Sequence, residues 1–373
     1  MGVGVKMKKR IVLLFVILIS FILMNVGVIA AEDSQADKQK LITDMAGREL
    51  MVPTKINKIF AANNTGAVLG YCLVPDKLIG WNSKLNNNMK KYIKGKATSL
   101  PVMGTLYGNA KSKANLEEIA LTAPDIILLM SPKITKKVIN SADKITGKLG
   151  IPVIVIDGQF KNTGKTLEFL GGLLGEKERA EKLKDYFENV YQKVITIAVD
   201  IKQEQRVNVY YARGDKGLTT EIKGSPNTEI LRLLRARNVV DLNISAENTS
   251  GLAGNYTVTM EQLLLWNPDL IIVGSGFYTA SGLVDIIKED KSWQSLKAVA
   301  NRQLFFIPCA PFNWIDRPPS LNRIIGLVWA AENIYPDLYN FDLAEEIKKF
   351  YKLFYHYDLT ETELNKLLDC RLK

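Results

Sequence analysis

The sequence predicts an α/β protein in which two Rossmann-like lobes, each with a parallel sheet, are joined by one long linker helix. Three features of the 373-residue chain predict this class. Short β-branched segments alternate with helical patterns, a long unbroken helical pattern lies near the middle, and one helix–turn–strand element occurs on either side of it. A chain of this length, 47% hydrophobic, is large enough for two packed lobes, each with its own core.

Eight short apolar segments are predicted as strands, four on each side of the central helical pattern. Their alternation with helical stretches is typical of parallel βαβ units. Continuous apolar runs such as 126–129 and 270–273 indicate burial on both faces, as for parallel strands between helices. The predicted strands are 58–62, 77–81, 125–130 and 152–157 in the first set, and 207–211, 239–242, 269–274 and 304–308 in the second.

The segment 177–202 contains no Gly or Pro and carries one apolar stripe with alternating spacings of three and four residues. This period is that of a continuous amphipathic helix, which would span roughly 38 Å at 1.5 Å per residue. It could be an ordinary surface helix of one domain. Its length and its place between the two strand sets favour a rigid strut between lobes.

Residues 114–129 align without gaps on residues 258–273. Glu117 falls on Glu261, and in each copy a Pro-Asp pair separates a short helical pattern from a buried strand. An internal repeat of this kind indicates that the same structural unit occurs twice in the fold, so it constrains the architecture of the whole chain. One copy on each side of the long helix indicates two related lobes.

The first residues differ from the rest of the chain. Four cations, from Lys6 to Arg10, precede an apolar run that ends in small residues near Ala30, so residues 1–31 are predicted to be an export signal peptide. An uncleaved membrane anchor is the alternative. Loss of the four cations lowers the formal net charge from +10 to +6. Without a basic run or an interleaved aromatic strip, nucleic-acid binding is not expected, whereas a mild preference for anionic ligands remains.

Residues typical of catalysis are scarce. The single histidine, His356, lies in an aromatic tail far from any nucleophile motif, and there is no G-x-S-x-G sequence. The glycine-rich segment 158–166 has one residue too many between its glycines to be a phosphate-binding loop. Three widely spaced cysteines suggest neither a disulfide framework nor a zinc site. We therefore do not expect an enzyme, and we expect no cofactor or metal of the protein's own.

The repeated helix–Pro-Asp–strand element, the long helix and the export signal together resemble the helical-backbone (class III) substrate-binding proteins of ABC importers, the iron-siderophore, haem and cobalamin type. The resemblance covers the chain from about Ile42 to its end. It implies a ligand cleft between the lobes and one docking carboxylate on each lobe for the permease, here Glu117 and Glu261. The alternative for both is an ordinary acid in the first turn of a helix.

The resemblance further implies an exported protein, in the periplasm or at the outer face of the cytoplasmic membrane, with an ABC permease and its ATPase subunits as partners. We expect a monomer that binds an anionic metal complex, with ferric siderophore first and corrinoid, haem or an oxyanion such as molybdate as alternatives. Alternatives of another class are a membrane-tethered sensor and a cofactor-bearing enzyme. The expected domains are a signal peptide (1–31), an N-terminal lobe (32–162), a linker helix region (163–203) and a C-terminal lobe (204–373).

Ligand contacts are expected where strands end and loops begin, because open α/β sheets bind ligands at the carboxyl ends of their strands. The candidates are polar or aromatic residues at such positions. They are Asn64, Thr65, Trp81, Tyr107, Arg213, Tyr256, Tyr278, Trp314 and Arg317.

Arg317 is the candidate with the clearest chemistry. It lies in a loop stiffened by two prolines, ahead of Ser320, which could cap the next helix. A guanidinium close to a helix N-terminus predicts a position for negative charge on the ligand. Alternatively, Arg317 pairs with Asp316 or another carboxylate, and Trp314 is core filler rather than a ligand wall.

Overall fold

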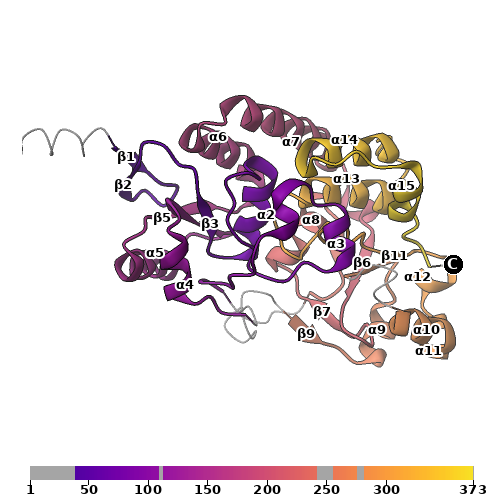
Figure 1. The fold of residues 1–373 in the computed structure, drawn as a ribbon. Coiled ribbons are helices and arrows are strands. Elements are labelled where there is room, and N and C mark those ends of the chain that lie inside the picture. The colour runs from indigo at the N-terminus through magenta and orange to yellow at the C-terminus, as the bar shows by residue number, and fades with distance from the viewer. Residues whose placement is uncertain (1–37, 109–111, 242–254, 275–280, 373) are drawn as a thin grey trace, which may run out of the picture.

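The computed structural model describes residues 38–108, 112–241, 255–274 and 281–372, which form two α/β units (Figure 1). The strands within these ranges are β1 (Gln39–Thr43), β2 (Glu49–Pro53), β3 (Ile59–Ala61), β4 (Ile126–Ser131), β5 (Val153–Asp157), β6 (Asn208–Ala212), β7 (Thr219–Glu221), β8 (Arg237–Asn238), β9 (Asn255–Thr257), β10 (Leu270–Val273) and β11 (Leu304–Phe306). Parallel sheets of order β3-β4-β5 and β11-β10-β6-β8 confirm the predicted fold class. The antiparallel pairs β1-β2 and β7-β9 complete the strands. The predicted export signal and Tyr278 lie outside the described residues.

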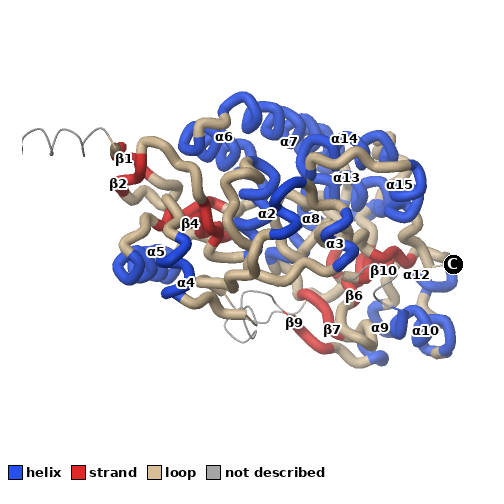
Figure 2. The backbone as a smooth tube through the Cα atoms, in the orientation of Figure 1, coloured by secondary structure: helices blue, strands red, loops and turns tan. Residues whose placement is uncertain are grey.

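Helices surround both parallel sheets (Figure 2). They are α2 (Asn64–Leu73), α3 (Asn87–Lys91), α4 (Leu116–Thr122), α5 (Lys136–Leu149), α6 (Thr163–Leu174), α7 (Lys177–Ala198), α8 (Glu229–Leu233), α9 (Met260–Trp266), α10 (Ser281–Glu289), α11 (Lys291–Gln294), α12 (Lys297–Ala300), α13 (Arg323–Ile334), α14 (Leu343–Tyr355) and α15 (Glu361–Leu368). Short 3₁₀ turns occupy Gly95–Ser99, Phe160–Asn162, Gln203–Gln205 and Pro226–Thr228. In both figures α6, α7, α13 and α14 lie along the same edge of the molecule.

Two predicted strands are wrong in detail. The segment 77–81 forms no continuous strand, because it bridges to β3 only at Leu78 and then turns to pair with a different segment. The strand predicted at 239–242 is displaced, because β8 ends at Asn238 and residues 239–241 form no strand, while residue 242 lies outside the described residues. There the Asn238 side chain accepts a hydrogen bond from the backbone N–H of Val240 (3.0 Å), and this local turn takes the chain out of the sheet.

The internal repeat folds into the same element twice, as α4 followed by β4 and as α9 followed by β10. Each helix ends at a left-handed residue in the same repeat position, Ala123 (φ 45°) or Asn267 (φ 39°). The following aspartates also act alike. Asp125 accepts hydrogen bonds from two backbone N–H groups just before β3 (2.6 and 2.8 Å), and Asp269 accepts one from the first N–H of β6 (3.0 Å). Each Pro-Asp turn therefore fixes the neighbouring strand of its sheet.

The long helix is continuous over the 22 residues of α7, about 33 Å at 1.5 Å per residue. It ends four residues earlier than the pattern predicted. Because α7 packs against other helices, it belongs to a helical layer and is not an isolated strut between the lobes. It packs against α6 and α13, and the hydroxyl of Tyr186 donates to a carboxylate oxygen of Glu346 in α14 (2.6 Å). The Tyr339 hydroxyl also donates to the carbonyl of Val194 (3.1 Å).

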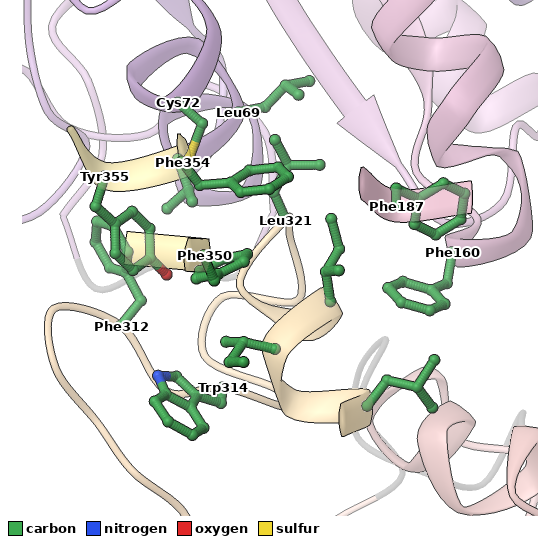
Figure 3. Close-up of a cluster of buried hydrophobic side chains, with 14 of the residues drawn as sticks. Leu69, Cys72, Phe160, Phe187, Phe312, Trp314, Leu321, Phe350, Phe354 and Tyr355 are labelled. Atoms are coloured by element: carbon green, nitrogen blue, oxygen red, sulfur yellow. The ribbon is translucent and has the colours of Figure 1, made fainter. Parts of the chain in front are cut away.

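The hydrophobic core has three parts. One cluster covers a face of the first sheet and another a face of the second, as two separate lobes would require. The third and largest contains side chains from both lobes and from the helical layer. Figure 3 shows part of it, with Leu69 of α2, Phe187 of α7, and Phe350 and Phe354 of α14. Each lobe thus has a cluster of its own, and the two lobes also share a third.

The single histidine lies in this helical layer. His356 ends α14 with a left-handed backbone (φ 56°), and its Nε2 lies 3.3 Å from the carbonyl of Tyr71 and 3.2 Å from Nη2 of Arg179. Burial, and then the charge of Arg179, lower the pKa of His356. Its contacts join α2, α7 and α14, which is a structural role.

Candidate ligand-binding site

Three strands of the second sheet end at one edge, where two of the predicted residues meet. Arg213 follows β6, Gly274 follows β10, and the loop after β11 carries Arg317. The Arg317 Nη2 donates to the carbonyl of Gly274 (2.7 Å). Asp316 lies between the two guanidiniums, with Nε of Arg317 at 3.4 Å and Nε of Arg213 at 3.9 Å. The carboxyl ends of parallel strands therefore bring both arginines to one place, as expected.

The charges of this cluster balance. A second buried carboxylate, Glu221, pairs with Arg213 and accepts further hydrogen bonds from Ser225 (2.6 Å) and Asn227 (2.9 Å). Burial lowers the pKa of Arg213 and Asp316 opposes that effect. For Arg317, burial is the largest effect and lowers the pKa, but Asp316, Tyr211 and Cys309 together outweigh it, so the pKa lies above its ordinary value. Both guanidiniums are therefore cationic, and two carboxylates compensate them. The ion pair between Arg317 and Asp316, which was the alternative prediction for Arg317, is present in the structure.

The two arginines differ in what they leave available. The Arg213 side chain is 15% exposed and is held by buried acids, whereas that of Arg317 is 46% exposed. Within the described residues Nη1 of Arg317 makes no hydrogen bond. Arg317 can thus present a directed donor pair to a ligand, while Arg213 mainly supports the cluster.

The loop that carries Arg317 is held by side-chain amides that sequence reasoning missed. Oδ1 of Asn313 accepts hydrogen bonds from the backbone N–H groups of Ile315 (2.8 Å) and Asp316 (3.0 Å), and its Nδ2 donates to the carbonyl of Gly274 (3.2 Å). Asn322 Nδ2 donates to the carbonyl of Pro318 (2.9 Å). An Asn at the start of a proline-rich loop is the only signal the sequence offers for this anchoring.

Ser320 does not cap a helix, because α13 begins only at Arg323. Its hydroxyl instead donates to the carbonyl of Thr65 (2.8 Å) in the first lobe. Thr65 and Asn64 form the first turn of α2, which Asn63 caps by accepting from the N–H of Gly66 (3.1 Å). The start of α2 is thus joined across the lobe boundary to the segment that follows Arg317.

A small cavity lies at this boundary, with a volume of about 10 Å³, room for one water molecule. Both lobes line it, the first at the ends of β4 and β5 and the second through the segment after the two prolines. The lining residues are Met130, Gly158, Phe160, Thr163, Thr166, Pro319, Ser320, Leu321 and Arg323. The strand ends of the first lobe therefore face the segment that follows Arg317 in the second lobe.

The two tryptophans do not line a surface. Trp314 is fully buried, and Trp81 is buried with its Nε1 donating to the carbonyl of Ala97 (2.7 Å). The Trp81 ring lies 6.1 Å from that of Phe312, and Figure 3 shows Trp314 among the side chains of the shared core. Both tryptophans were predicted to contact the ligand, but neither has exposed surface, because α14 and its neighbours cover them. Core filler describes Trp314 better.

The predicted tyrosines take different positions. Tyr107 is half-buried, and its backbone N–H donates to the carbonyl of Ala62 just after β3 (3.0 Å). Burial raises the pKa of its hydroxyl, which remains a donor at neutral pH. Tyr256 is half-buried on β9, opposite Thr220 of β7, the strand next to Arg213.

A further tyrosine at the second-lobe edge was missed. The Tyr211 hydroxyl is fully buried and interacts with the side chain of Asp316. Burial, and then the charge of Asp316, raise the pKa of Tyr211. Tyr211 is therefore part of the buried cluster that holds Asp316 beside the half-exposed Arg317.

Glu117 and Glu261 are exposed and equivalent. Each is the second residue of its helix, in α4 behind the cap Asn115 and in α9 behind the cap Thr259. Bonds from its own backbone N–H and from the Thr259 hydroxyl lower the pKa of Glu261. In Figure 1, α4 and α9 lie toward the lower edge, on opposite sides, whereas α7 lies along the upper edge.

Within the described ranges, no group of three histidine, cysteine, aspartate or glutamate side chains could hold a metal ion. None of the helices in those ranges combines the length and the apolar character that a bilayer crossing requires.

Gly274 offers a direct test of the cluster. A Cβ at this position would lie 3.0 Å from Cγ of Arg213, 3.1 Å from Nη2 of Arg317 and 3.1 Å from the Tyr211 hydroxyl. We expect Gly274→Ala to displace Arg317 and to lower the free energy of unfolding by about 1–3 kcal/mol, measured by urea denaturation. Gly172→Ala is the control, because a Cβ there meets no atom within 4 Å. Equal stability of the two variants would contradict the crowded geometry.

Comparison with known proteins agrees with this architecture. A solute-binding protein of an ABC transporter from Sulfurospirillum deleyianum has 29% sequence identity and a TM-score of 0.77, over 88% of this chain and 98% of that one. A periplasmic solute-binding protein from Veillonella parvula (22% identity, TM-score 0.68, 88% and 96% coverage) shares the fold. So does the molybdate periplasmic binding protein of Haemophilus influenzae (19% identity, TM-score 0.66, 86% and 99% coverage).

No curated protein matches the chain. The family described as periplasmic binding protein matches residues 82–311, more than half of the sequence, and the resemblance inferred from the sequence is thereby confirmed. The chain belongs to the periplasmic binding protein family.

Proposed function

We propose that this chain captures an anionic metal complex, with ferric siderophore first, and delivers it to the permease of an ABC importer. Family membership supports a substrate-binding component of such a transporter. The finer assignment rests on the second-lobe cluster around Arg317. The protein binds and releases its ligand without catalysis, and it needs no cofactor or metal of its own.

The observation that carries the proposal is the half-exposed guanidinium of Arg317. One nitrogen is fixed on the carbonyl of Gly274, while Asp316 holds Nε. The planar fork is therefore oriented before a ligand arrives, which suits the oxygens of a carboxylate, hydroxamate, catecholate or oxyanion. Because two carboxylates balance the two arginines, directed hydrogen bonds rather than excess positive charge would hold the ligand. Its affinity should depend only modestly on salt.

Other candidates complete the proposed site. Asn64, Thr65 and Tyr107 supply donors at the strand ends of the first lobe, and Tyr256 borders the second-lobe edge. Tyr278 stays a candidate from sequence alone. The contact between Ser320 and Thr65 places the start of α2 close to the loop of Arg317, so that a ligand held by one lobe lies near the other.

The proposal extends to delivery. Glu117 and Glu261 would dock the permease, one from each lobe, through charge pairs that steer and register the encounter. The protein would act as a monomer outside the cytoplasm, after export directed by residues 1–31. N-terminal sequencing of the mature protein distinguishes this from a membrane-tethered sensor. A cofactor-bearing enzyme would instead carry a bound group with its own absorption spectrum after purification.

The test is a titration with a panel of probes: catecholate, hydroxamate and carboxylate ferric siderophores, a corrinoid, haem and molybdate. We expect a ferric siderophore to bind most tightly. For that probe, Arg317→Ala should weaken binding about ten- to a hundredfold, because a hydrogen bond to a charged group contributes about 1.5–3 kcal/mol. Arg317→Lys should recover only part of the loss, since a point charge cannot copy the planar fork.

The matched control is Arg232→Ala, an exposed arginine on α8 that pairs with Glu229. It should bind as the wild type does. Unchanged affinity of Arg317→Ala for every probe bound by the wild type would remove Arg317 from the site. Tightest binding of corrinoid, haem or molybdate would replace the siderophore assignment with that ligand.

A further inference from the structure

The helices α4 and α9, which carry Glu117 and Glu261, share a second exposed feature: a leucine one turn after the glutamate. Leu121 of α4 is 88% exposed and Leu265 of α9 is 83% exposed, the highest values among the exposed large hydrophobic side chains of the described residues. The two leucines occupy the same position of the internal repeat, as Glu117 and Glu261 do. In each helix Glu and Leu are four residues apart and therefore lie on the same face.

Neither leucine serves the core of its own lobe. The inward positions of the two helices belong to Ile119 and Leu263, both fully buried. A single exposed leucine is common on protein surfaces and needs no explanation. Here, however, the same apolar residue stands outward at equivalent places of two lobes that differ at most other positions of the repeat. In each place it stands beside an exposed carboxylate.

From this juxtaposition we infer that Leu121 and Leu265 are apolar anchors, which insert into two equivalent sockets of the permease beside the cations that meet Glu117 and Glu261. This inference rests on the proposed function and adds the chemistry of the partner surface. Each socket combines an apolar pocket with a basic side chain, and it occurs twice at a spacing set by the two lobes. The carboxylates would steer the encounter, while burial of the leucines would slow dissociation.

The test measures binding of purified, fluorescently labelled chain to right-side-out membrane vesicles from its host. We expect Leu121→Ser with Leu265→Ser to weaken binding at least about tenfold, as loss of buried interface anchors does. The dependence of binding on salt should persist in this variant, because its carboxylates remain. Leu41→Ser is the control, since Leu41 is 61% exposed on β1 and has no counterpart in the repeat. It should bind as the wild type does.

The outcomes separate the two claims. If the double leucine variant binds like the wild type while Glu117→Arg with Glu261→Arg does not, the anchors are wrong and docking stands. If the wild type does not bind these vesicles, the proposed delivery function fails as well. Photo-crosslinkers at positions 121 and 265 should both attach to the same multispanning membrane protein. Attachment to a second copy of this chain would overturn the inference in favour of self-association.

Discussion

Reversal of both docking carboxylates, Glu117→Arg together with Glu261→Arg, should abolish metal accumulation by cells in which the variant replaces the wild type. In the proposed docking, each arginine would face a cation of the permease, so the encounter would change from attraction to repulsion on both lobes. Both side chains are exposed and lie on the short helices of the repeat. The fold and the ligand affinity of the purified protein should therefore be kept.

The control for this experiment reverses two other exposed acids, Glu118 of α4 and Glu289 of α10. It makes the same change of net charge at two residues that are not equivalent to each other, since Glu118 falls on Gln262 in the repeat and Glu289 lies outside it. Normal metal accumulation by the control and none by the docking variant would support the assignment. Normal accumulation by both would show that Glu117 and Glu261 are ordinary helix-terminal acids.

Val190→Pro should destabilise the whole protein, because α7 passes through the layer that both lobes share. Proline removes the backbone donor at this position and clashes with the preceding turn, which costs about 3 kcal/mol or more. Val190 is also buried in the shared core, between α7 and its neighbours. We expect a lower unfolding midpoint in urea and, under native conditions, a broader distribution of shapes in solution scattering.

Val190→Ala separates the backbone effect from the lost side chain. This variant keeps the helix and removes two methyl groups, so its destabilisation should be clearly smaller. If the two variants unfold at the same midpoint and scatter alike, α7 is not needed as a continuous helix between the lobes.

The elements that the sequence predicted best are those with two independent signals. The strands β4 and β10 follow from both continuous apolar character and the internal repeat, and all four of their ends lie within one residue of the prediction. The strand predicted at 239–242 had only its β-branched residues in its favour. A single hydrogen bond from the backbone N–H of Val240 to the Asn238 side chain moved its end, and such local competition has no periodic signature.

The residues of the candidate site also differ in how well the sequence predicted them. Strand order at the edge of a parallel sheet was enough to bring Arg213 and Arg317 together. Glu221, which holds Arg213, comes from the β7-β9 pair, and its partner strand is distant in sequence. The tryptophans were misjudged for a related reason. An aromatic residue after a strand suits a ligand wall or a core equally, and α14, which arrives late in the chain, buries Trp314.

Identification of the natural ligand tests the central claim most directly. The protein should be purified from its host under metal-limited and metal-replete growth, then analysed by native mass spectrometry and elemental analysis. We predict one metal complex per chain, negatively charged and released intact on denaturation, with ferric siderophore as the expected identity. A metal-free or uncharged ligand, or a chain that stays empty when such complexes are supplied, would contradict capture of an anionic metal complex.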